Sequence, residues 1–182
     1  MTWQVFLTLG AGYEPTANLV SNALSRILGN ATFYSTLTSG ARPVMDAVVE
    51  VLHHETPLTN YGVYYARKPV SFHGVWLRAA VPVVVAFGAL AGESEQRHGS
   101  VRHPGDASHL SWGAGPHTCP VKQHVLLIAT EAIERLTQWL PDLEPVVPRD
   151  RLTWRPGPFH RSLTALPVRF SPRTIDLAGD PT

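Results

Sequence analysis

The stretch HLSWGAGPHTCP, residues 109–120, decides how this sequence folds and what it can bind. It contains Cys119, the single cysteine of the chain, directly before Pro120, a residue favoured in the first turn of a helix. A helix that starts on the cysteine places backbone N–H groups and the positive end of its dipole beside the sulfur, and both favour a thiolate. Gly113 and Gly115 let the backbone approach a flat ligand closely. The stretch therefore predicts a thiolate that serves as an anionic axial ligand.

A second side chain of this stretch, His117, lies two residues before the cysteine. We expect its imidazole to reach the edge of the same ligand and to hydrogen-bond a carboxylate there. One histidine and one cysteine are too few to hold a metal ion directly by themselves. The alternative, an inert buried cysteine in a glycine-rich turn, stays open on these residues alone, because free cysteines are commonly buried.

The composition is that of a globular protein. Of 182 residues, 44% are hydrophobic and 16% are charged, with a net charge of +1, so we expect one domain, residues 1–182, with a buried core. A charge so close to neutral argues against nucleic acid as the main partner. Residues 79–91 form the longest late apolar run, but Pro82 interrupts it and it is shorter than the roughly 20 residues that cross a bilayer. We expect no transmembrane segment and a cytoplasmic location.

Apolar spacing predicts three main helices. The first covers residues 3–28 and has Pro15 in its middle, where we expect a kink that leaves the carbonyl of Ala11 without its helical hydrogen bond. The second covers residues 43–52 and begins on a proline. The third starts on the cysteine and continues over residues 119–139.

Between the second and third predicted helices the pattern changes. Residues 61–86 are rich in β-branched and aromatic side chains and predict a small antiparallel sheet with a turn at residues 73–74. Residues 92–109 are polar and turn-forming, which indicates a loop. Short apolar pieces separated by prolines over residues 153–170 predict short strands and turns. The expected fold class is mainly α with a small antiparallel β-sheet.

The stretch around Cys119 resembles the haem-binding loop of cytochrome P450s, whose pattern is F-x-x-G-x-H-x-C-x-G. Val121 stands where the pattern has its last glycine. The resemblance implies a haem b cofactor whose iron is bound by the cysteine, so that Cys119 is both a cofactor-binding residue and the metal ligand. The positions that match the loop are Trp112, in place of the phenylalanine, Gly113, Gly115, His117 and Cys119.

The sequence AGYEPT, which starts at Ala11, resembles the A-G-x-[DE]-T-[ST] segment of the distal I helix of the same family. The resemblance implies that Ala11 and Gly12 line the distal side of the haem, and that Glu14 and Thr16 are catalytic residues of a proton relay. Pro15 replaces the threonine of the pattern, and Thr16 points about 100° further around the helix. We therefore expect an impaired relay, which favours a peroxide-driven reaction over efficient monooxygenation.

Two further segments occur in the family's order. EVLH, residues 50–53, resembles the E-x-x-R of the K helix, with His53 in place of the arginine, and we expect a hydrogen bond from His53 to Glu50. RSLTALPVRF, residues 161–170, resembles the closing β segment. The arginine that binds a haem propionate in the family has no counterpart at its usual strand position, which leaves Arg67 as a candidate beside the loop histidine.

These segments together resemble a truncated cytochrome P450 fold that runs from the I helix onward. The resemblance implies, in order, the I helix, the K helix, a β-sheet, the cysteine-ligand loop, the L helix and a C-terminal β segment. The helices that precede the I helix in the family have no counterpart in the chain. We expect a homo-oligomer or hetero-complex that covers the surface left exposed by this missing N-terminal half.

Two functions follow from the resemblance. The first is a haem-thiolate oxidoreductase, a monooxygenase or a peroxide-driven enzyme, served by a ferredoxin-type redox partner. The second is a non-catalytic accessory or signalling scaffold derived from a P450. Its motivation is that the departures from the family pattern resemble actinobacterial P450-like proteins of small-GTPase signalling operons. A scaffold of that kind implies a small-GTPase-linked complex and a location at the membrane periphery through a partner.

Overall fold

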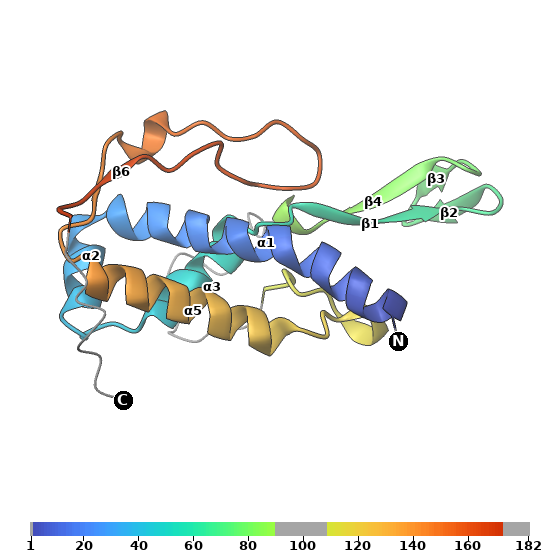
Figure 1. Cartoon of the computed structure of the whole chain (residues 1–182). Coiled ribbons are helices and arrows are strands. Elements are labelled where there is room, and N and C mark those ends of the chain that lie inside the picture. Colours follow the sequence, from blue (N-terminus) through green and yellow to red (C-terminus); the bar gives the residue numbers. More distant parts are fainter. Residues whose placement is uncertain (1, 90–108, 173–182) are drawn as a thin grey trace.

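The computed structural model describes residues 2–89 and 109–172 and is mainly helical (Figure 1). Helices α1 and α5 run side by side, and α3 packs against both. Small antiparallel ribbons accompany the helices, so the predicted fold class is confirmed. The predicted loop over residues 92–109 lies outside the described residues, apart from its last one. The bounds of the main helices are α1 Thr2–Leu28, α2 Ala31–Thr38, α3 Val44–His54 and α5 Lys122–Trp139.

The core lies where α1, α2, α3 and α5 meet. Because apolar side chains recur every three to four residues in these helices, each helix presents one apolar stripe to the others. Burial of such a side chain stabilises the fold by about 1.5–3 kcal/mol. The buried apolar residues of this cluster are Leu19, Ala23, Leu24, Ile27, Phe33, Leu37, Val44, Ala47, Val48, Val51, Leu52, Val125, Ala129 and Ile133.

Helix α1 divides into two halves with different surroundings. From Asn18 onward it contributes buried residues to the core, whereas residues 2–11 are exposed throughout. Pro15 lies inside the helix, which continues past it to Leu28. The first half therefore extends beyond the helical core, towards the end of the molecule where the N-terminus lies in Figure 1.

One helix was not predicted, and one predicted helix starts later than expected. The periodicity did not predict α2, a helix of 8 residues that begins after Asn30, whose side chain accepts a hydrogen bond from the backbone N–H of Phe33 at 3.0 Å. The third helix was predicted to start at Cys119, but α5 starts at Lys122. Pro120 and the N-cap residue Val121 form a turn that leads into it.

The predicted sheet over residues 61–86 consists of two separate ribbons. Strand β1 (Asn60–Tyr65) pairs with β4 (Pro82–Ala86), and β2 (Val70–Phe72) pairs with β3 (Val75–Leu77). The predicted turn between β2 and β3 is confirmed: its two central residues both have positive φ, 46° at His73 and 81° at Gly74, as a tight hairpin turn requires. The ribbons project beyond the helices (Figure 1).

The C-terminal segment returns over α1 on the side opposite α5 (Figure 1). It contains the pair β5 (Glu144–Pro145) and β6 (Val168–Arg169) and an isolated bridge between Trp154 and Leu163. A second bridge joins Leu58 to His160 and so connects this segment to the chain just before β1. The predicted short strands and turns are thus present. Among the helices described, none combines the length and the apolar character needed to cross a membrane.

Candidate functional site

The loop that precedes α5 is closed by its own backbone. The N–H of Cys119 donates to the carbonyl of Trp112 at 2.8 Å, and the N–H of Gly113 donates to Leu110 at 2.8 Å. Gly113 has φ +69° and Gly115 has φ +68°, a left-handed conformation that strains any residue with a Cβ. A Cβ on Gly113 would also lie 3.4 Å from the carbonyl oxygen of His117. Both glycines are therefore required by the backbone path itself.

Cys119 sits at the end of this loop with a half-buried, free thiol. A 3-10 turn, Gly115–His117, comes just before it, and the N-cap of α5 is Val121. Because the helix begins after the cysteine, the N–H of Cys119 itself bonds within the loop and is not one of the open donors at the helix N-terminus. The positive end of the α5 dipole thus lies just after Cys119 in the chain. Cys119 is therefore near the limit of the one-turn range over which a helix dipole acts.

The loop is fastened to the C-terminal end of α3. The hydroxyl of Ser111 donates to the carbonyl of Leu52 at 2.5 Å, one of the last carbonyls of that helix, which have no partner inside it. The rings of His53 and His109 meet edge to face with centroids 4.9 Å apart. Trp112 packs against the core, while the exposed side chain of His117 leaves its imidazole accessible. The loop is therefore connected directly to the C-terminal end of α3.

The residues predicted on the distal side lie on α1. Nothing comes within 4 Å of a Cβ built on Gly12, so this part of the helix faces open space. The hydroxyl of Thr16 donates to the carbonyl of Gly12 at 2.5 Å, and Glu14 forms an ion pair with Arg155 of the C-terminal segment at 2.5 Å. Ala11 is exposed. Both predicted relay residues are thus engaged in bonds of their own.

The hydrogen bond from His53 to Glu50 stays a prediction, and the structure adds two arginine partners for Glu50. The two carboxylate oxygens of Glu50 accept from Arg26 of α1 at 3.2 Å and from Arg42 at 2.8 Å. Histidine has no planar fork of donors, and these two arginines supply the guanidinium groups that residue 53 lacks. Sequence spacing gave no signal for Arg26, because its carboxylate partner lies on another helix, 24 residues away in the chain.

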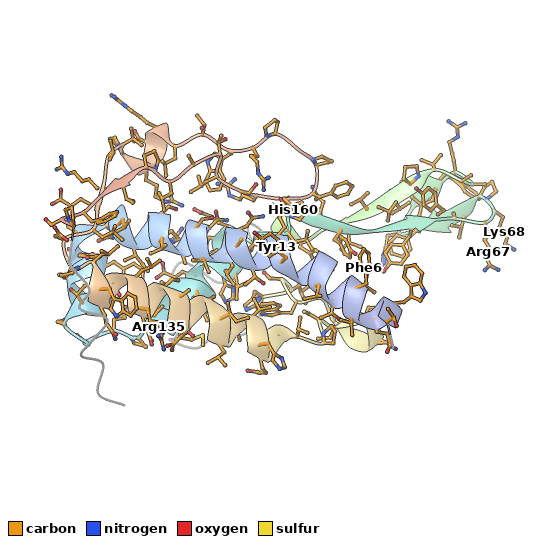
Figure 2. All side chains as sticks on the ribbon, viewed as in Figure 1. Phe6, Tyr13, Arg67, Lys68, Arg135 and His160 are labelled. Atoms are coloured by element: carbon orange, nitrogen blue, oxygen red, sulfur yellow. The ribbon has the colours of Figure 1, made fainter. Side chains whose placement is uncertain are left out.

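Arg67, the second candidate for a propionate, is not brought to this loop. Figure 2 shows Arg67 and Lys68 at the outer end of the ribbon, directed away from the helices. A groove of about 590 Å³ lies between α2 and the start of α3, at the end of the helical core away from the start of α5 (Figure 1). Among the described residues, no group of three or more histidine, cysteine or acidic side chains is arranged to hold a metal ion.

The residues present fit a haem held by one thiolate. The donor set at the loop is a single sulfur, as an axial ligand requires, and the sulfur is half-buried and accessible. Gly115 presents open space on the loop side, where a Cβ would meet nothing within 4 Å, as Gly12 does on α1. The buried indole Nε1 of Trp112 has no hydrogen-bond partner within the described structure. A flat ligand could therefore approach both segments without displacing a side chain.

In sequence and in fold, this chain matches cytochrome P450s over the C-terminal part of their fold. It is 32% identical over 168 residues to cytochrome P450 107B1 of Saccharopolyspora erythraea, covering 91% of this chain and 42% of that protein. It is 30% identical over 168 residues to the cytochrome P450 monooxygenase PikC of Streptomyces venezuelae, covering 90% of this chain and 40% of that protein. The chain thus spans about two fifths of the length of these relatives.

Solved structures give the same assignment. CYP154C4 from a Streptomyces strain superimposes with a TM-score of 0.80 at 27% identity, over 90% of this chain and 41% of that one. The myxobacterial CYP267B1 superimposes with a TM-score of 0.82 at 24% identity, over 93% and 43% of the two chains, which supports the fold. No protein-family model matches the chain. The predicted resemblance to cytochrome P450s is confirmed, and the resemblance to small-GTPase operon proteins stays a prediction.

Proposed function

We propose that this chain binds haem b with Cys119 as the thiolate ligand of the iron and acts as a P450-type oxidoreductase. The observation that carries the proposal is the loop from Trp112 to Cys119, closed by the 2.8 Å bond between these two residues, with its sulfur accessible at the end. When bound, haem with a thiolate ligand supplies the electron density that favours O–O cleavage. A ferredoxin-type redox partner is the electron donor that this class of reaction calls for.

The chain's own residues divide the work of holding the cofactor. Cys119 supplies the anionic ligand, and Gly113 and Gly115 keep the loop backbone low enough for a planar ring to lie against it. His117, whose side chain is exposed, can donate a hydrogen bond to a propionate. Gly12 keeps the facing side of α1 free of side-chain atoms.

Proton delivery is the weak part of the proposed site. Pro15 has no hydroxyl, and the hydroxyl of Thr16 already donates to the carbonyl of Gly12. The carboxylate of Glu14 forms an ion pair with Arg155 of the C-terminal segment, so it is already engaged with a partner outside α1. These bonds support a peroxide-driven reaction, because peroxide brings its own protons and both oxygen atoms. Pro15→Thr should raise dioxygen-driven turnover of a test substrate relative to peroxide-driven turnover of the same substrate. An unchanged ratio of the two turnover rates would contradict an impaired relay.

The decisive experiment is the visible absorption spectrum of the purified protein with and without added haem. We expect haem to bind in equimolar amount and the reduced carbon monoxide complex to show a thiolate-type Soret band. Cys119→Ser should remove that band, whereas Thr118→Ser, which preserves the neighbouring hydroxyl bonded to Gly115 at 2.8 Å, should leave it unchanged. A wild-type protein that stays colourless, or that gives no thiolate-type band, overturns the proposal.

A second candidate function, an interaction scaffold, is favoured by the exposed first half of α1. Trp3, Phe6 and Leu9 on this half are 83%, 72% and 68% exposed, more apolar surface than a monomer ordinarily leaves to water. Figure 2 shows Phe6 and Tyr13 on this part of α1. A scaffold, with or without a small GTPase as its partner, should keep its association in Cys119→Ser and lose it in Phe6→Glu. Loss of association in both variants would argue against the scaffold.

A further inference from the structure

Six charged side chains form a chain of ion pairs along α3, from its first turn to its C-terminal end. The acids are Asp46, Glu50 and Glu55, and the arginines are Arg26 from α1, Arg42 before α3, and Arg149 from the C-terminal segment. Among the described contacts, Arg26 is the only one of these arginines that forms ion pairs with two acids distant from it in the sequence. Its Nη2 lies 3.2 Å from Glu50, and its Nη1 lies 3.2 Å from Glu55.

The acids need these partners because of where they are. Glu55 is the C-cap residue of α3, where the helix dipole disfavours negative charge, and Glu50 lies just before the last turn. The side chain of Glu55 is only 9% exposed, so water screens its charge poorly. Burial opposes the charge on Arg42, but hydrogen bonds and charges from Glu50 and Asp46 outweigh that effect and raise the pKa of Arg42. The two acids beside Arg42 therefore stabilise its charged form.

The end of α3 that carries these acids also carries the cysteine loop. The carbonyl of Leu52 accepts from Ser111 at 2.5 Å, and the ring of His53 contacts the ring of His109 at 4.9 Å. The position of this helix end thus decides where the loop begins. Arg26 fixes that end to α1, the helix whose other half carries the distal residues.

We infer that Arg26 is a positioning residue for the cysteine loop, in the role that an arginine at position 53 would otherwise fill. Arg26 stands on α1, so a single guanidinium fork connects the distal helix to the helix that holds the loop. The part of this inference that concerns haem rests on the proposed function. The part that concerns the order of the loop does not.

Hydrogen exchange on the protein without added haem tests the loop directly. In Arg26→Gln, we expect exchange of the loop amides of Gly113 and Cys119 to rise roughly 5–30-fold, the range that one or two lost stabilising contacts produce. Amides in the middle of α5, at Ala129 and Ile133, should not change by a comparable factor. Arg26→Lys, which keeps the charge but not the fork, should fall between the wild type and Arg26→Gln.

Two further variants keep the test informative. Arg135→Gln removes an exposed arginine of α5 that pairs with Glu131 in the same helix, and it should leave loop exchange unchanged (Figure 2). Ser111→Ala removes the hydrogen bond between the loop and α3 but leaves the charged side chains unchanged. It should therefore raise loop exchange even if Arg26→Gln does not fold. Loop exchange in Arg26→Gln that rises no more than exchange in α5 overturns the inference; if Arg26→Gln does not fold, the same comparison in Arg26→Lys decides.

Haem titration provides the second measurement. Arg26→Gln should bind haem with a smaller thiolate-type fraction in the reduced carbon monoxide spectrum, and Arg26→Lys should recover part of it. If the wild type binds no haem, the proposed function fails while the exchange result still decides the role of Arg26. If haem binds and its thiolate fraction is the same in wild type and Arg26→Gln, the positioning role is wrong.

Discussion

Gly113 shows how a single residue sets the path of the cysteine loop. Its φ of +69° lies in the left-handed region, and a Cβ there would lie 3.4 Å from the carbonyl oxygen of His117. We expect Gly113→Ala to lower the free energy of unfolding by about 1–2 kcal/mol, the cost of the left-handed conformation for a residue with a Cβ. Urea denaturation followed by circular dichroism measures this difference.

The matched control for that substitution is Gly10→Ala. Gly10 lies inside α1, and a Cβ built on it meets nothing within 4 Å. Because glycine is a poor residue for a helix interior, Gly10→Ala should stabilise the protein by up to about 1 kcal/mol. Stabilisation by both alanine variants would show that the loop glycine is not under backbone constraint.

Tyr34 carries the clearest pH signature of any single side chain described. Burial and the negative charge of Asp142 raise the pKa of Tyr34 above 10.0, although a backbone hydrogen bond from Leu143 lowers it in part. The phenol donates to the carbonyl of Pro141 at 2.9 Å, a bond that needs the neutral form. The stability from this group is therefore complete below the unfolded pKa of about 10 and is lost as the pH rises through the higher folded value.

The measurement is an ultraviolet titration of tyrosine ionisation in the folded protein. We expect Tyr34→Phe to remove the last ionisation step of the wild type and to flatten the loss of stability at alkaline pH. A Tyr34→Phe variant with the same alkaline titration and the same pH dependence of unfolding would show that the phenol is not held neutral by its neighbours.

At the scale of elements, helix α2 shows where the sequence pattern falls short. Its 8 residues span about two turns, too few for the apolar spacing of Phe33 and Leu37 to stand out from chance. The local signal was present in Asn30, an N-cap residue whose side-chain oxygen accepts from the N–H of Phe33. Long helices such as α1, α3 and α5 were predictable because their stripes repeat over several turns.

The same N-cap gives a prediction for α2. Asn30→Ala should lower the free energy of unfolding by about 1 kcal/mol, because it leaves the N–H of Phe33 without its partner. Asn30→Asp keeps an accepting oxygen and adds a charge that suits a helix N-terminus, so it should retain the wild-type stability. Thermal unfolding checks both variants; equal losses for alanine and aspartate would contradict the capping role.

The candidate site was predictable only in part, for a related reason. The loop residues Cys119, His117 and the two glycines are close in sequence, so their resemblance to the haem-binding loop could be recognised without the fold. The partners of Glu50 and Glu14 were not predictable from spacing. Arg26 and Arg155 reach these carboxylates across 24 and 141 residues of chain, and only the packed fold sets such distances. Helix α5 starts at Lys122, three residues after the predicted start at Cys119, because the N–H of Cys119 closes the loop by donating to the carbonyl of Trp112.

At the scale of the whole molecule, the accessible surface is larger than that of a compact monomer of the same mass. The accessible surface is 12768 Å², whereas a compact monomer of 19.9 kDa exposes about 8,700 Å². Obligate complexes commonly bury 2,000–5,000 Å² in total, which is about 1,000–2,500 Å² on each subunit, so an interface of this size covers part of the excess of about 4,000 Å² on this chain. The first half of α1 and the projecting ribbons contribute large apolar residues to it, among them Trp3, Phe6, Phe72 and Trp76. We therefore expect the chain to bury this surface against a second copy of itself when it is alone in solution.

Self-association of this kind makes thermal stability depend on protein concentration, because the folded dimer is favoured by mass action. The Tm of the wild type should rise over a hundredfold increase in protein concentration. Leu9→Glu places a charge on the exposed first half of α1, 68% exposed in the single chain, and should abolish that rise without lowering the Tm at the lowest concentration. Leu127→Glu, on the exposed side of α5 at 65% exposure, is the control for a charge placed elsewhere. A wild-type Tm that is independent of concentration, together with sedimentation as a monomer, would contradict burial of the α1 surface against a second copy.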